Sequence, residues 1–173
     1  TSHPHDLSDA LVEVFRDEPK VMPHFHLPVQ SGSDPVLARM RRDYGVAEYL
    51  DRFERLRAAR PGIAITTDFI VGFPGETEED FSETLEVVED VRYDGAFTFV
   101  YSPRRGTEAA AMPDQVPEDV KRERIERLID VVQRIARERN EERVGGVEEV
   151  LVEGPSRTDP ALLRGRTRRN TTV

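Results

Sequence analysis

Three short segments in this sequence combine residue types that can bind a ligand. They are residues 30–34 (QSGSD), 72–76 (GFPGE) and 101–107 (YSPRRGT). In the first, the amide of Gln30 offers a donor and an acceptor, two serines add hydroxyls, and a glycine lets a ligand approach the backbone. This composition suits a polar cradle for a small molecule, although an ordinary strand-to-helix turn explains it as well.

The other two segments suit a flat ring and an anion. The backbone at Val71 and Gly72 can lie against a planar ring, and the adjacent Arg104 and Arg105 can contact a carboxylate or a phosphate. The simpler alternatives are a Pro-Gly turn in one segment and solvated loop arginines in the other.

The histidines raise the question of a metal site. His24 and His26 alternate, so on a strand they would face the same side. The sequence places no carboxylate or third ligand beside them, and a chain without cysteine supplies no thiolate for a metal or an iron–sulfur cluster. We therefore expect no metal ligands in this chain.

A group of arginines near the C-terminus suggests contact with phosphates. Arg164, Arg166 and Arg168 alternate, with Arg169 beside them, and on a strand the alternating three would form a basic stripe. The whole chain has a formal charge of −9, which excludes a uniformly basic nucleic-acid-binding protein. We expect a local RNA or phosphate contact instead.

Alternating strands and helices must position these residues. Apolar spacing predicts helices after Ser8, after Asp34 as N-cap, from Gly45 to Pro61, from Thr77 to Val91 and from Pro117 to Arg143, and strands over 21–29, 63–73 and 94–103. Such alternation predicts an α/β fold of parallel strands joined by crossover helices. Ligands in these folds bind beyond the carboxyl ends of the strands, where the three segments lie.

The pattern changes after Gly146, where VEEVLVEGPS alternates like an exposed antiparallel strand. We predict a domain boundary that separates residues 1–144 from residues 145–173. Three parallel strands cannot close a barrel and the second unit is too short to close on itself, so we expect a fragment. Its missing strands should precede Thr1, and residues 1–5 would follow the last of them. No apolar run approaches the roughly 20 residues that span a bilayer, so we expect a cytoplasmic protein without membrane contact.

Together these segments resemble the tRNA methylthiotransferases. The resemblance runs from Thr1 to Val173 in the family's order, and it is carried by HLPVQSGSDPVLARM, TTDFIVGFPGETEEDF, FTFVYSPRRGTEAAAMPDQV and VEGPSRTDPALLRGRTRRN. The sequence is most similar to the branch that adds a 2-methylthio group to N6-isopentenyladenosine at tRNA position 37, beside the anticodon.

The resemblance implies a radical S-adenosylmethionine (SAM) enzyme with a partial (β/α) TIM-like barrel. Residues 1–144 would form the C-terminal part of this barrel, and residues 145–173 the start of a small β domain, the RNA-binding TRAM domain. The family carries two [4Fe-4S] clusters, whose cysteines would lie outside this chain, so the fragment alone should be inactive. The implied partners are the tRNA anticodon stem-loop, a sulfur donor and an electron donor system.

The resemblance also implies roles for particular residues. Gln30, Ser31 and Ser33 would face the ribose and methionine parts of SAM, and Ile70, Val71, Gly72 and Phe73 would line its adenine. Tyr101 and Ser102 would lie near SAM, and Arg104 near the substrate base. Arg164, Arg166, Arg168 and Arg169 would contact RNA. One SAM would supply a radical that removes hydrogen from C2 of the adenine, a second SAM the methyl group, and the N-terminal cluster the sulfur.

Several related readings stay open. The threonylcarbamoyladenosine branch shares QSGSD and VGFPGET, whereas the ribosomal-protein branch usually differs in the first of these segments. A non-catalytic RNA-binding module could reuse the same fold, and a purely structural fragment would bind no SAM at all.

Overall fold

A computed structural model describes residues 3–173, so Thr1 and Ser2 of the predicted first loop lie outside the described residues. Its main sheet contains three parallel strands in the order β1 (His24–His26), β2 (Ala64–Val71) and β3 (Gly95–Val100), which confirms the predicted topology. The strands are shorter than the sequence suggested, and β1 keeps only the centre of the 21–29 segment.

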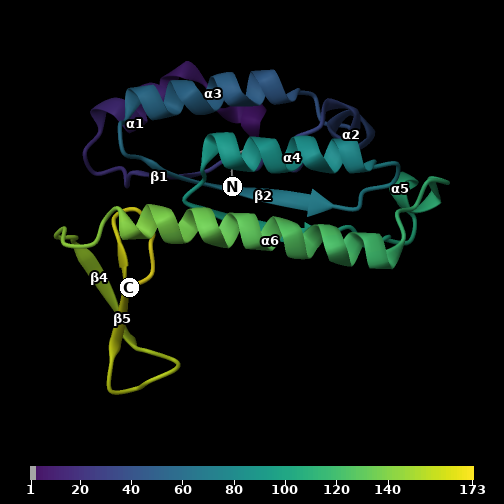
Figure 1. Cartoon of the computed structure of the whole chain (residues 1–173). Helices are drawn as coiled ribbons and strands as arrows, with labels where there is room; N and C mark the ends of the chain where they lie inside the picture. Colours follow the sequence, from purple (N-terminus) through teal and green to yellow (C-terminus); the bar gives the residue numbers. More distant parts are fainter. Residues whose placement is uncertain (1–2) are drawn as a thin grey trace.

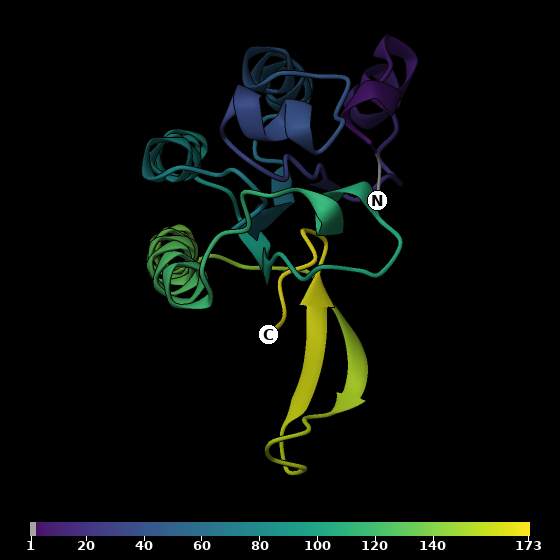
Figure 2. The same ribbon diagram turned by 90° about the vertical axis from the view of Figure 1, so that its right-hand side faces the viewer.

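The helices are the short 3-10 helix η1 (Pro4–Asp6) and α1 (Asp9–Asp17), α2 (Asp34–Arg39), α3 (Val46–Ala59), α4 (Glu78–Val91), α5 (Glu108–Ala111) and α6 (Glu118–Glu141). The longer ones lie in an arc around one side of the sheet, and α5 lies apart from them, beyond the end of β2 (Figures 1 and 2). Among residues 3–173, no helix is both long and apolar enough to cross a lipid bilayer.

Local capping signals explain where most of these helices begin. Ser8 accepts a hydrogen bond from Leu11 N at the start of α1, and Thr77 and Asp80 form the predicted capping box of α4. The prediction for Asp34 was wrong. The N-cap of α2 is Ser33, and the Asp34 carboxylate instead accepts from Val46 N at 2.7 Å, which ties α2 to the start of α3.

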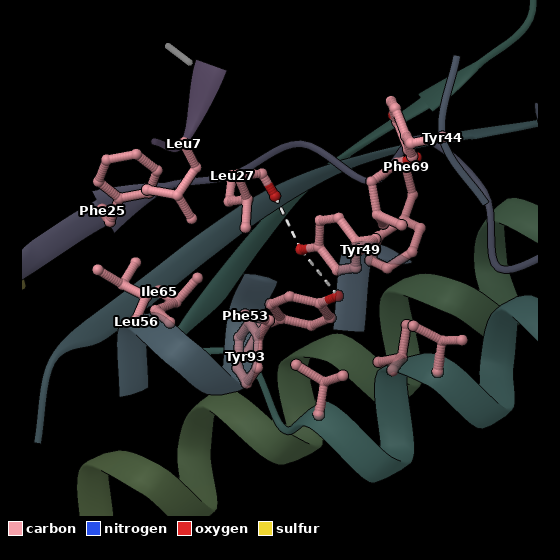
Figure 3. Close-up of a cluster of buried hydrophobic side chains, with 14 of the residues drawn as sticks. Leu7, Phe25, Leu27, Tyr44, Tyr49, Phe53, Leu56, Ile65, Phe69 and Tyr93 are labelled. Carbon is pink, nitrogen blue, oxygen red and sulfur yellow. Dashed lines mark hydrogen bonds between the residues drawn. The ribbon is translucent and has the colours of Figure 1, made fainter. Parts of the chain in front are cut away.

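The core lies between the helices and one face of the sheet. Figure 3 shows its aromatic centre, where Tyr93 donates to the Tyr49 hydroxyl at 3.1 Å and Tyr49 donates to Leu27 O at 2.9 Å. Phe53 and Phe69 pack edge to face against the Tyr93 ring. This chain of hydroxyls satisfies the polar atoms of two deeply buried tyrosines, so the strand that precedes the first loop is anchored to α3.

The opposite face of the sheet carries a polar and aromatic row. Thr66, Asp68 and Ile70 of β2 alternate with buried neighbours and are only partly covered. His24 and His26 both contact the Thr66 hydroxyl, at 3.2 and 2.9 Å, so they do face the same side of β1. Phe97, which is 61% exposed, lies on this face beside His26.

A second sheet follows α6. It is an antiparallel hairpin of β4 (Val150–Pro155) and β5 (Leu163–Thr167) that extends away from the first sheet (Figure 1). The expected stripe of alternating arginines is only partly formed, because β5 ends at Thr167 and Arg168 lies beyond it. An irregular register between Val152 and Gly154 bends the hairpin at its middle.

A single buried carboxylate, Asp94, joins this hairpin to the first sheet. It accepts hydrogen bonds from Ile65 N at 3.0 Å, from Arg143 at 2.7 Å, and from Arg139 and Arg169 at 3.2–3.3 Å. The arginines come from the end of α6 and from the turn after β5. Burial lowers the pKa of Arg169, and the neighbouring Arg143 adds to this effect, while Asp94 opposes it.

Replacing Asp94 with alanine should therefore destabilise the chain strongly. We expect Asp94→Ala to lower the free energy of unfolding by about 3 kcal/mol, because Arg139, Arg143 and Arg169 lose the carboxylate that they share. We call Asp94 and these three arginines the Asp94 joint. The control Asp90→Ala, at an exposed position on α4, should change it by less than about 0.5 kcal/mol. Chemical denaturation measures both. Equal stabilities of the two variants would show that Asp94 does not hold the joint.

Candidate ligand-binding site at the carboxyl edge of the sheet

A cavity of about 510 Å³ opens where the carboxyl ends of the parallel strands meet. Its volume falls within the roughly 300–1,000 Å³ of small-molecule sites. Of the predicted residues, the structure brings six together in its lining: Gln30, Ile70, Phe73, Tyr101, Ser102 and Arg104. The lining also contains Thr107, from the predicted 101–107 segment, and five residues that the sequence did not single out: Met40, Arg42, Phe99, Val100 and Ala109.

Gln30 is held at the first wall in a left-handed backbone conformation, with φ of 74°. Its N–H donates to Asp68 O at 2.9 Å, and its carbonyl accepts from Ile70 N at 2.9 Å. These bonds extend the parallel pairing with β2 past the end of β1. A non-glycine residue in this conformation is held at an energetic cost, which is typical of functional sites.

The two predicted serines lie behind Gln30 and do not line the cavity. Ser31 contacts the Thr84 hydroxyl at 3.3 Å, and Ser33 donates to Asp80 at the start of α4. Both are buried, so within residues 3–173 their hydroxyls serve the protein itself. Gly32 fits between them because a Cβ there would lie 2.6 Å from Thr84 Cα, so the loop packs directly on α4.

Asp80 connects this loop to the start of α4. Burial alone would raise its pKa, but hydrogen bonds from Ser33 and Thr77 and the charge of Arg39 outweigh it, so the pKa of Asp80 is lowered. The ionised carboxylate therefore fixes the start of α4 and the first loop at once.

Gly72 is the turning point of the second wall, with φ of 73°. Its N–H donates to the Glu76 carboxylate at 2.9 Å, and Arg124 of α6 donates to the same oxygen at 2.8 Å. Burial raises the pKa of Glu76, and the bond from Gly72 and the charge of Arg124 counteract it in part. Val71 and Gly72 support the cavity from behind, while Ile70 and Phe73 line it.

Arg42 is a charged lining residue that the sequence reasoning missed. It lies in the turn after α2 and lines the cavity, and its Nε is buried without a hydrogen-bond partner among residues 3–173. Arg42 as a whole is half-buried, and a guanidinium at a cavity wall is suited to a carboxylate or a phosphate. The only signal in the sequence is the run Met40-Arg41-Arg42 at the end of a short helix, which alone indicates nothing beyond a favourable helix end.

The third wall follows β3. The Tyr101 ring meets the Phe73 ring edge to face at 5.1 Å, and Tyr101 N donates to Val71 O at 2.9 Å. Arg104 is exposed at the mouth. Nearby, Arg41 forms an ion pair with Glu108, so the turn after α2 is connected to α5 across the mouth.

The C-terminal arginines are distributed over two environments. Arg164 and Arg166 share the carboxylate of Glu153 on β4, each at 3.2 Å. Arg168 pairs with Glu149 and donates to Pro19 O, and Arg169 belongs to the Asp94 joint. Carboxylates therefore partly neutralise the positive charge on the hairpin. Arg169 contacts the first sheet through Asp94.

A second cavity, of about 610 Å³, lies at the base of the hairpin between His24, Leu151 and Arg166. It is at the amino ends of the strands, opposite the edge where parallel α/β folds bind ligands. We therefore take the cavity at the carboxyl edge as the candidate site. No group of histidines and carboxylates within residues 3–173 is arranged to hold a metal ion.

The geometry defines the class of parallel α/β folds with a cavity at the carboxyl edge of the sheet. The family model described as "Radical SAM superfamily" matches residues 1–88. The chain therefore belongs to the radical SAM superfamily.

Curated relatives resemble the whole chain. It is 65% identical to the tRNA-2-methylthio-N(6)-dimethylallyladenosine synthase of Anaeromyxobacter sp. (strain K), and the match covers 100% of this chain and 38% of that protein. The protein of the same name from Myxococcus xanthus (strain DK1622) is 57% identical, again over 100% of this chain and 38% of the relative. The chain thus spans less than two fifths of the length of these relatives.

A solved structure confirms the fold. The coproporphyrinogen III oxidase HemN from Escherichia coli, a radical SAM enzyme, superimposes with a TM-score of 0.64. The match covers 77% of this chain and 31% of HemN, at 18% identity. At this identity the likeness concerns the fold alone, and it supports the predicted partial barrel.

Proposed function

We propose that this chain is part of a radical SAM methylthiotransferase that converts N6-dimethylallyladenosine (isopentenyladenosine) at position 37 of tRNA to its 2-methylthio form. The observation that carries the proposal is the match to synthases of that name over the whole chain at 57–65% identity. The names favour this branch over the threonylcarbamoyladenosine alternative. A tRNA substrate also suits the expected cytoplasmic location.

The cavity at the carboxyl edge fits SAM. Ile70, Phe73 and Phe99 give it apolar walls for a planar adenine, and Gln30 and Ser102 offer polar groups for the ribose. Arg42 also lines the cavity, and its guanidinium suits the carboxylate of the methionine part. When bound, SAM supplies the radical and the methyl group, while the protein supplies position and exclusion of water.

Each wall then has a separate task. The strained backbone at Gln30 presents its side chain to the cavity without needing a conformational change on binding. The Phe73 and Tyr101 rings exclude water from one side of the ligand, and Arg104 at the mouth remains available for the substrate nucleotide. The cysteines that would hold the clusters must come from other parts of the longer protein, because this chain contains none.

The hairpin would begin the RNA-binding TRAM domain. Its separate antiparallel sheet and the exposed charges of Arg164 and Arg166 support this proposal. Both arginines keep donors beyond those that reach Glu153, so a phosphate can bind without displacing that carboxylate. The anticodon stem-loop would be the partner, and the sulfur and electron donors would act on the clusters.

Arg42 provides a test of the cofactor assignment. In the longer protein, Arg42→Gln should weaken SAM binding by about 10- to 100-fold, because a charge-assisted hydrogen bond to the carboxylate is lost. Binding of 5′-methylthioadenosine, which lacks the amino-acid part, should change by less than about twofold. Calorimetric titration of both ligands measures this.

Arg122→Gln, at an exposed position on α6, is the matched control and should leave both affinities unchanged. Equal weakening of SAM and 5′-methylthioadenosine by Arg42→Gln would place Arg42 away from the carboxylate. Unchanged affinity for both ligands would remove Arg42 from the site.

Nucleoside mass spectrometry tests the reaction itself. Transfer RNA from cells that lack the full-length gene should lose 2-methylthio-N6-isopentenyladenosine and accumulate its precursor without the methylthio group. Loss of the 2-methylthio-threonylcarbamoyl nucleoside instead would favour that branch. If neither nucleoside changed, the methylthiotransferase proposal would fail.

A further inference from the structure

A deeply buried lysine lies directly behind the candidate site. Lys121, in the first turn of α6, has a side chain that is only 2% exposed. Its ammonium donates to Glu118 at 2.7 Å, but that carboxylate is 78% exposed. Lysine is almost never buried this completely unless it is paired, so a lysine held by one solvated carboxylate requires another explanation.

The aliphatic stem of Lys121 supports the backbone of the second wall. A Cβ placed on Gly72 would lie 2.4 Å from Lys121 Cγ and 3.0 Å from its Cδ, so the stem fills the space beside Gly72. On the other side, the Gly72 N–H is held by Glu76, which Arg124 anchors one turn further along α6. The start of α6 therefore fixes Gly72 from both directions.

The ammonium of Lys121 reaches the third wall. It lies 5.6 Å from the centroid of the Tyr101 ring, a separation at which a cation is attracted to an aromatic face. The Tyr101 hydroxyl is buried and has no hydrogen-bond partner within residues 3–173. The ring is thus positioned by Phe73 and Lys121, and not by a hydrogen bond from its own hydroxyl.

We propose that Lys121 is a positioning residue for the adenosine part of the cofactor. Its stem supports Gly72 and its charge holds Tyr101, so one side chain sets the distance between the two walls of the slot. Lys121 does not line the cavity, and it acts through these two neighbours. The inference rests on the proposed function, which places SAM between them.

Three variants of the longer protein distinguish the role of the Lys121 stem, which supports Gly72, from the role of its charge, which holds Tyr101. Lys121→Met keeps most of the stem and removes the charge, and it should weaken SAM binding by about threefold. Lys121→Ala removes both, and a weakening of about tenfold is expected, which corresponds to about 1.4 kcal/mol. Arg122→Met, the exposed neighbour, should bind SAM like the wild type. At saturating SAM, turnover by the folded variants should return close to the wild-type value, since Lys121 touches no reacting atom.

A double-mutant cycle with Gly72 gives the sharpest test. Gly72→Ala should weaken SAM binding more in the wild-type background than in Lys121→Ala, because the shortened side chain frees the space that a new Cβ needs. A role in folding alone would change the unfolding midpoint without this compensation in SAM affinity.

The outcomes distinguish the two proposals. If the wild type binds no SAM, the proposed function fails and the positioning role fails with it. If the wild type binds SAM but the cycle is additive and Lys121→Met binds like the wild type, only the positioning role is overturned. If Lys121→Ala does not fold, Lys121→Met alone decides, and an affinity equal to the wild type overturns the role of the charge.

Discussion

The parallel pairing of Gln30 with β2 is the interaction on which the candidate site depends. β1 itself is short, and the hydrogen bonds from Gln30 to Asp68 and from Ile70 to Gln30 carry the sheet pattern beyond it. Because the first loop stays in register with β2, Gln30 is bonded to Ile70 and lines the same cavity as Ile70 and Phe73. Without this pairing the three loops would share an edge of the sheet but no common site.

Helix α6 connects that site to the rest of the molecule. Its first turns carry Lys121 and Arg124, which support Gly72. Arg139 in its last turn and Arg143 just after its end both bind Asp94. With 24 residues it is about 36 Å long. One helix therefore contacts both the second wall of the cavity, through Gly72, and the base of the hairpin, through Asp94.

The sequence predicted what local signals encode. Alternating apolar spacing gave the strand and helix order, and the capping box of Thr77 and Asp80 marked the start of α4. The loops at the carboxyl ends followed from topology alone. In contrast, the serines of the first loop could not be placed, because their partners Thr84 and Asp80 lie some fifty positions away in the chain. Arg42, Lys121 and the Asp94 joint were missed for the same reason, since their roles arise only from tertiary packing.

The arginines near the C-terminus show that a cluster of charges in the sequence does not predict which ion pairs form in the structure. Alternation placed Arg164 and Arg166 correctly on one strand, but their pairing with Glu153 depends on the hairpin register. In the sequence Arg169 belongs to the same group of arginines. In the structure it pairs instead with Asp94, just before β3. The same residue type therefore forms an exposed ion pair on the hairpin in one place and a contact with the first sheet in another.

A crystal structure of the longer protein with SAM would test the central claim most directly. The proposal predicts SAM in the cavity at the carboxyl edge, with its adenine between the 70–73 segment and Tyr101 and its carboxylate bonded to Arg42. SAM bound elsewhere, for example at the base of the hairpin, or an adenine that avoids Ile70 and Phe73, would contradict it.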